Sequence, residues 1–90
     1  MKVVQAASFK RAVKKMHRNQ KQALDDAVRA IVQNPEIGEL KKGDLATLRV
    51  FKYKLATTQY LLGYSYDDKG EVIALVAIGT HENFYRDVKR

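Results

Sequence analysis

The chain has 90 residues and no cysteine, so we expect one domain with neither a disulfide framework nor a thiolate metal site. No apolar run has the length of a membrane span or resembles a signal-peptide core, so the sequence predicts a soluble cytoplasmic protein with no membrane partner. Lys and Arg total 17 against 10 acidic residues, giving +7, which favours a polyanion or an acidic protein as partner over an incidental surplus of surface charge.

The first third of the chain predicts a short strand and two helices. Residues 1–6 form the expected strand, and Ser8 is a candidate N-cap for the first helix. That helix carries apolar residues at helical spacing: Phe9, Ala12, Val13 and Met16. A break at residues 17–19 precedes the second helix, for which Asn19 is a candidate cap. Its apolar residues form one wide stripe: Ala23, Leu24, Ala27, Val28, Ile31 and Val32.

The remaining chain predicts three strands after a loop over residues 35–46, which begins where Asn34-Pro35 stops the second helix. The strands are expected over residues 47–55, 59–66 and 71–78, and the Asp67–Gly70 segment is a strong hairpin signal between the last two. The last strand is almost wholly apolar, which is typical of the interior of a sheet. The order β-α-α-β-β-β predicts an α+β fold over residues 1–90, with a helical hairpin packed on a small, mostly antiparallel sheet.

Lys52 and Lys54 are the first candidates for chemistry. Their spacing places both ammonium groups on one side of a strand, roughly 7 Å apart along the backbone, on the face that also carries Leu48 and Val50. Two lysines so placed could hold a phosphate and stabilise the charge that develops on it. They could equally mark the solvated end of that face, or protect an edge strand from aggregation.

His81 and Tyr85 follow the last strand and are four residues apart, so they share a face if the tail is helical. A tyrosine ring can stack on a nucleobase while an imidazole transfers a proton to or from a phosphodiester. The alternative is that Phe84 and Tyr85 only pack the tail against the sheet. His17 is expected to be a surface residue. The chain has no phosphate-binding loop, dinucleotide motif or metal-ligand cluster, so no cofactor or metal is expected.

Three segments in this order resemble the RelE/ParE superfamily of bacterial toxins, over nearly the whole chain. They are Gly43-Asp44-Leu45 with Leu48–Leu55, then Tyr60–Tyr64, then Gly79–Tyr85. The resemblance implies the toxin half of a type II toxin–antitoxin pair, with a cognate antitoxin as partner. In the RelE-like branch it implies cleavage of messenger RNA on the ribosome by 2′-hydroxyl attack. In the ParE-like branch it implies inhibition of DNA gyrase without an active site.

The resemblance also assigns roles to residues of this chain. Lys52 and Lys54 match the basic pair that holds the scissile phosphate and helps to activate the 2′-hydroxyl. His81 matches the group that protonates the leaving oxygen, and Tyr85 matches the aromatic residue that stacks on a base. Further substrate contacts are expected from cations near these positions: Arg49, Arg86, Lys89 and Arg90.

One position departs from the RelE pattern, since Leu61 stands where an arginine would neutralise the phosphate. Arg49, Lys69 or Arg86 could replace that charge, or catalysis could be weak or absent. The favoured hypothesis is therefore a ribosome-dependent endoribonuclease that needs no metal. The alternatives are a gyrase-binding toxin and a nuclease that acts on DNA.

Overall fold

The computed structural model describes residues 1–41, 48–67 and 69–88, with the side chains of all of these except Asp87. The described elements are, in chain order, β1 (Lys2–Gln5), α1 (Ala7–Lys14), α2 (Arg18–Gln33), β2 (Glu39–Leu40), β3 (Arg49–Leu55), β4 (Thr58–Asp67), β5 (Val72–Thr80) and α3 (His81–Val88). This is the expected α+β class. None of the described helices is long and apolar enough to cross a membrane.

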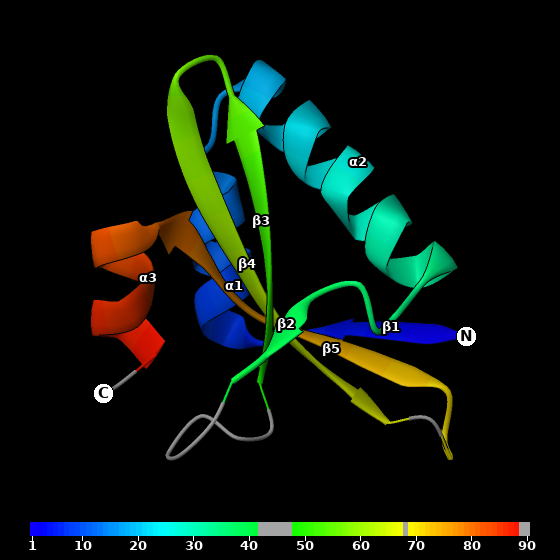
Figure 1. Cartoon of the computed structure of the whole chain (residues 1–90). Helices are drawn as coiled ribbons and strands as arrows, with labels where there is room; N and C mark the ends of the chain where they lie inside the picture. Colours follow the sequence, from blue (N-terminus) through cyan, green and yellow to red (C-terminus); the bar gives the residue numbers. More distant parts are fainter. Residues whose placement is uncertain (42–47, 68, 89–90) are drawn as a thin grey trace.

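The strands form one sheet in the order β1-β5-β4-β3-β2 (Figure 1). β1 runs parallel to β5, and the other three pairings are antiparallel, as the prediction of a mostly antiparallel sheet requires. β5 lies between β1 and β4, so the apolar strand at the end of the chain is interior. Its position explains its composition, because both of its faces are covered.

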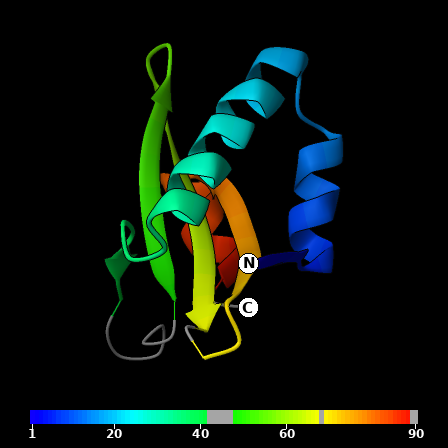
Figure 2. The same ribbon diagram turned by 90° about the vertical axis from the view of Figure 1, so that its right-hand side faces the viewer.

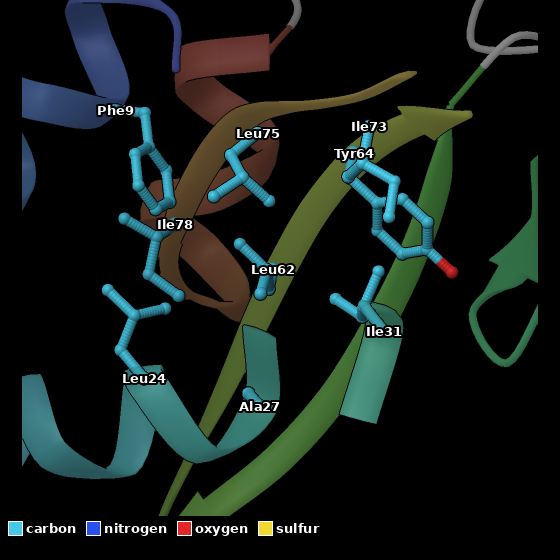
Figure 3. Close-up of a cluster of buried hydrophobic side chains, with 9 residues drawn as sticks. All are labelled: Phe9, Leu24, Ala27, Ile31, Leu62, Tyr64, Ile73, Leu75 and Ile78. Atoms are coloured by element: carbon cyan, nitrogen blue, oxygen red, sulfur yellow. The ribbon is translucent and has the colours of Figure 1, made fainter. Parts of the chain in front are cut away.

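The helices cover both faces of the sheet. α1 and α2 lie on one face and α3 lies on the other (Figures 1 and 2). Between α1, α2 and the sheet is the larger core cluster, shown in Figure 3: Phe9, Leu24, Ala27, Ile31, Leu62, Tyr64, Ile73, Leu75 and Ile78. Under α3 is a second cluster of buried residues: Leu48, Val50, Leu61, Ala77 and Phe84.

The apolar stripe of α2 is confirmed except at its outer margin. Leu24, Ala27 and Ile31 are buried, and Ile31 is fully enclosed. Val32 is 37% exposed, because it lies one residue, or about 100°, around the helix from Ile31. The stripe belongs to the core cluster that also contains Ile73 and Leu75 of β5, which alternate with residues that face α3.

Both predicted helix caps are wrong. α1 begins at Ala7 with Ala6 as N-cap, and Ser8 lies inside the helix, where its Oγ donates a hydrogen bond to the Val76 carbonyl at 3.2 Å. The β4–β5 register shifts at this point and leaves Val76 without a cross-strand partner, so its backbone is open to a side-chain donor. α2 begins at Arg18, one residue before Asn19, with His17 as an exposed N-cap.

Two elements were not predicted as such. β2 is a two-residue strand within the expected loop, too short to produce an alternating pattern of its own. The segment before it is anchored by Tyr64, whose hydroxyl donates to the Pro35 carbonyl at 2.7 Å and accepts the Gly38 N–H at 2.9 Å. Figure 3 shows this hydroxyl pointing out of the core cluster. α3, which was expected only conditionally, follows β5 without an intervening loop.

Candidate active site

α3 is fixed on the sheet by Phe84, which decides where its other side chains lie. Phe84 is fully buried in the cluster that contains Leu61 and Ala77. Gly63 of β4 makes room for its ring, since a Cβ atom added at Gly63 would lie 2.7 Å from Phe84 Cζ. The absence of a side chain at Gly63 therefore lets α3 pack directly on β4.

His81 and Tyr85 lie on one flank of α3, as the spacing of four predicts for a helical tail. Their ring centroids are 4.9 Å apart with an interplanar angle of 60°, so the rings meet edge to face. The Tyr85 ring also meets the buried Phe84 ring at 5.1 Å and 89°. Tyr85 is thus held between a core residue and the exposed imidazole of His81.

Lys41 brings a cation to the same flank. Its Nζ lies 5.8 Å from the centroid of the Tyr85 ring and 3.5 Å from Oε1 of Glu39, and its side chain is only 20% exposed. The neighbouring side chains of Tyr85 and Glu39 outweigh the effect of burial and raise the pKa of Lys41 above its ordinary value. Lys41 is therefore a fixed positive charge at neutral pH.

Lys41 was missed because nothing in the sequence distinguishes it from another loop lysine. Its place follows from β2 pairing: Leu40 is opposite Arg49, and the Lys41 N–H donates to the Leu48 carbonyl at 2.9 Å. Alternation along this ladder puts Lys41 on the face that α3 covers. Lys41 can be placed on this face only from the short pairing of β2 with β3.

Lys52 and Lys54 lie on this face too, both exposed. Lys52 is opposite Leu61 on β4, and Leu61 is opposite Gly79, two residues before His81. At about 4.8 Å per strand spacing, β3 and β5 are about 10 Å apart, so β4 separates the lysine pair from the start of α3. The four residues predicted to act together thus share one face of the sheet, and Lys41 adds a fifth polar group.

Leu61 itself is fully buried under α3. A position enclosed by Phe84 and Val50 contributes packing rather than charge. Position 61 therefore supplies no charge to this surface.

Arg49 lies on the opposite face of the sheet. It alternates with Val50 and Lys52, and its Nη1 donates to the carbonyls of Gly38 at 3.0 Å and Glu36 at 3.3 Å. The guanidinium therefore binds the chain segment before β2 and does not join the lysine pair.

Two other expected cations also lie away from this flank. Arg86 is on the far flank of α3, where its Nη2 donates to Asn83 Oδ1 at 2.6 Å. Lys69 is in the turn between β4 and β5, at the opposite end of that hairpin from the Tyr60–Thr80 pair. Lys89 and Arg90 lie outside the described residues. Of the cations on the described part of the chain, Lys41 is the one placed beside Tyr85.

The arrangement supplies a proton-transfer group, an aromatic face and several ammonium groups on one surface. Such a set suits an anionic substrate that contains a base, since lysines stabilise charge on phosphate oxygens and an aromatic ring stacks on the base. Among the residues that the structure describes, no group of three or more His, Asp or Glu side chains is placed to hold a metal ion.

A family model matches residues 3–89 and is described as the ParE-like toxin of type II bacterial toxin–antitoxin systems. The family match makes this α+β domain a bacterial toxin by class. The chain belongs to this ParE-like toxin family, within the RelE/ParE superfamily that its sequence resembles.

Solved structures agree on the fold. RelBE2 from Mycobacterium tuberculosis, a toxin–antitoxin complex, gives a TM-score of 0.77 at 17% identity, covering 89% of this chain and 96% of that chain. The intact RelBE complex of E. coli gives a TM-score of 0.71 at 18% identity, covering 88% of this chain and 94% of that chain. The isolated E. coli RelE toxin gives a TM-score of 0.69 at 20% identity, covering 99% of this chain and 96% of that chain. No curated protein gives a significant match.

Proposed function

We propose that this toxin is a ribosome-dependent endoribonuclease that cleaves messenger RNA in the cytoplasm without a metal ion. The observation that carries the proposal is the cluster of His81, Tyr85 and Lys41 on the same face as Lys52 and Lys54. A toxin that acted only by binding another protein would not need a proton-transfer group, a stacking ring and phosphate-binding ammonium groups together.

In the proposed reaction, the 2′-hydroxyl of one nucleotide attacks the adjacent phosphorus, and the bond from phosphorus to the 5′-oxygen breaks. The products are a 2′,3′-cyclic phosphate and a free 5′-hydroxyl. Lys52 and Lys54 stabilise the charge on the non-bridging oxygens and on the attacking oxygen, whose proton passes to solvent as the new bond to phosphorus forms. His81, as the imidazolium, gives its proton to the leaving 5′-oxygen. Tyr85 stacks on a base beside the cleaved bond.

Lys41 has a place in this scheme because Leu61 is buried and uncharged. Its Nζ lies against the Tyr85 ring, so it is close to any base that Tyr85 holds. Its positive charge replaces the one that the RelE pattern supplies from position 61. Lys41 also packs over the Tyr85 ring, so it has both an electrostatic and a positioning role.

The test is cleavage of a defined messenger RNA in a purified translation reaction, with the new 5′-hydroxyl ends mapped. His81→Ala should lower the rate by about 10²–10⁴ through loss of proton transfer. Each lost ammonium group should cost about 10²–10³. Tyr85→Ala should weaken base stacking by about 1–3 kcal/mol.

Lys69→Ala is the matched control, because it removes an exposed lysine at the far end of the β4–β5 hairpin. It should leave the cleavage rate and the melting temperature unchanged. Full activity in folded His81→Ala and in the Lys52→Ala/Lys54→Ala double variant would refute the proposal. Cleavage of single-stranded DNA in place of RNA would refute the choice of substrate.

We further infer that a cognate antitoxin binds this chain and keeps it inactive. The support is membership of a toxin–antitoxin family and a net charge of +7, which suits a partner with an acidic, partly disordered segment. Association should slow with rising salt. Purification from the native operon that returned this chain alone would contradict the inference.

Inhibition of DNA gyrase is the second candidate, because the matching family model is described as ParE-like. It predicts that DNA replication stops before translation when the chain is induced, and that His81→Ala and Lys52→Ala remain toxic. The order in which the two processes stop separates the candidates.

A further inference from the structure

The net positive charge of the chain comes from one end of the sequence. No Asp or Glu occurs before Asp25, whereas residues 1–24 carry seven cations: Lys2, Lys10, Arg11, Lys14, Lys15, Arg18 and Lys21. Residues 25–90 carry ten cations and ten acidic residues. The whole surplus of +7 therefore lies on β1, α1 and the start of α2, and none of it comes from the residues around His81.

This charged region borders a groove between α1 and α3. β1 pairs with β5 only as far as the Gln5–Leu75 pair, so the second half of β5 has no described strand on that side. The space beside it is a groove of about 770 Å³, whose floor includes Ile78, Gly79 and Thr80. Its volume lies within the range of ligand sites in proteins.

Three cations line the groove from both of its walls. Arg11 comes from α1, Lys15 is the C-cap residue of the same helix, one turn further on, and Arg86 comes from α3. All three are exposed, and Arg86 is oriented by its hydrogen bond to Asn83. The lining includes no Asp or Glu, and its other polar members are Ser8, Gln20, Tyr60, Thr80 and Asn83.

We propose that this groove binds the phosphodiester backbone of single-stranded RNA, as a contact separate from the His81 surface. Arginine guanidinium groups bind phosphate through two parallel hydrogen bonds, and here they stand on facing walls. The amide and hydroxyl side chains suit sugar and phosphate oxygens. The partly exposed Met16 offers apolar surface on which a base can lie.

The charge pattern favours RNA over an acidic protein segment. Beyond the groove-lining residues Arg11 and Lys15, further cations follow at the start of α2, at Arg18 and Lys21. A stripe that extends beyond the groove matches a chain with one charge on every unit, as a nucleic acid has. An acidic protein segment could pair with all of these cations only if its carboxylates were spaced as regularly as the phosphates of a nucleic acid.

The groove and the His81 surface lie on different flanks of α3. Arg86 follows His81 by five residues, which is about 140° around a helix. Tyr85 contacts Lys41 on one flank, and Asn83 and Arg86 line the groove on the other. RNA in the groove therefore leaves the flank that carries His81 and Tyr85 uncovered. A longer strand that crosses the end of α3 can contact both the groove and the His81 surface.

The inference rests on the proposed function only for the identity of the ligand, and binding is measurable without cleavage. The probe is a labelled, mixed-sequence 2′-O-methyl RNA of about 12 nucleotides, which lacks the attacking hydroxyl and is within the size of single-strand sites. Its affinity for the purified chain is followed by fluorescence anisotropy over a series of salt concentrations.

The decisive comparison uses two double variants that lose the same amount of charge from α1 and its C-cap residue. Arg11→Gln/Lys15→Gln removes two groove cations, and Lys10→Gln/Lys14→Gln removes two cations of the same helix outside the groove. Each single-strand phosphate contact contributes about 0.7 to the magnitude of the slope of log K against log salt. At 0.1 M salt this corresponds to about a fivefold gain in the binding constant relative to 1 M salt. The affinity of Arg11→Gln/Lys15→Gln for the RNA probe should therefore fall about 25-fold, and that of Lys10→Gln/Lys14→Gln should fall much less. Arg86→Gln alone should lower the affinity about fivefold.

Equal losses in the two doubles would overturn the proposal, because net charge alone would then explain binding. So would a groove double that keeps its RNA affinity but loses affinity for poly-glutamate, which would make the groove a site for an acidic segment. All of these side chains are exposed, so equal melting temperatures are expected. A chain that binds the probe in the groove but cleaves no RNA would uphold this inference while refuting the endoribonuclease.

Discussion

Gly63→Ala should damage the site through the position of α3. The added Cβ would lie 2.7 Å from Cζ and 2.8 Å from Cε1 of Phe84, and 3.4 Å from Cδ1 of Leu48. Phe84 is fully buried, so its ring has no free space into which it can rotate. Relief requires α3 to move off β4, and His81 and Tyr85 move with it.

Inserting one methyl group into a closely packed core costs typically 1–3 kcal/mol, and we expect Gly63→Ala to fall in this range. Gly79→Ala is the matched control on the neighbouring strand, because a Cβ there meets its nearest atom, the Phe84 backbone nitrogen, at an ordinary 3.4 Å. Gly79→Ala should change the free energy of unfolding by less than about 0.5 kcal/mol.

The assay is urea unfolding of the single variants and of Gly63→Ala combined with Phe84→Leu. The smaller leucine gives the methyl group room, so the double variant should be more stable than the sum of the single losses predicts, by about 0.5–3 kcal/mol. Equal stability of Gly63→Ala and the parent chain, or strictly additive losses in the double variant, would refute the packing argument.

Ile31→Ala should cost about 2–5 kcal/mol, because Ile31 is fully buried, whereas Val32→Ala, at a 37% exposed position one residue later, should cost far less; thermal melts of both check the assigned face of α2. Burial, with a smaller effect from Tyr60, raises the pKa of Tyr53 from 10.0 to about 12. The folded state then holds this proton more tightly than the unfolded chain, so its contribution to stability is complete below pH 10 and is lost between pH 10 and 12. Urea midpoints of the parent chain should fall more steeply over that interval than those of Tyr53→Phe, and identical slopes would contradict the shift.

The strands and helices with a clear period were predictable from the sequence. β5 is the strongest case, since a nearly continuous apolar run is what an interior strand covered on both faces requires. α2 was as clear, because its stripe has the period of 3.6 residues. Helix starts were not, since Ser8 and Asn19 have cap-forming side chains but use them elsewhere: Ser8 on Val76 and Asn19 on the N–H of Gln20.

The candidate site was predictable only in part. The face shared by Lys52 and Lys54 follows from strand alternation, and the His81–Tyr85 pair follows from helical spacing. Arg49 was expected beside the lysines, although alternation alone separates it from them. Lys41 depends on tertiary pairing between β2 and β3, which leaves no periodic trace in the sequence.

The segment before β2 connects side chains on one face of the sheet with Lys41 on the other face. The Tyr64 hydroxyl and the Arg49 guanidinium, both on the α2 side, bind the backbone of residues 35–38, and Gly38 packs so closely on the Tyr64 ring that a Cβ would lie at 2.8 Å. Three residues later the same chain delivers Lys41 to the opposite face. We therefore expect that substitutions which repack the core between α2 and the sheet would also move the Lys41 charge beside Tyr85, on the opposite face.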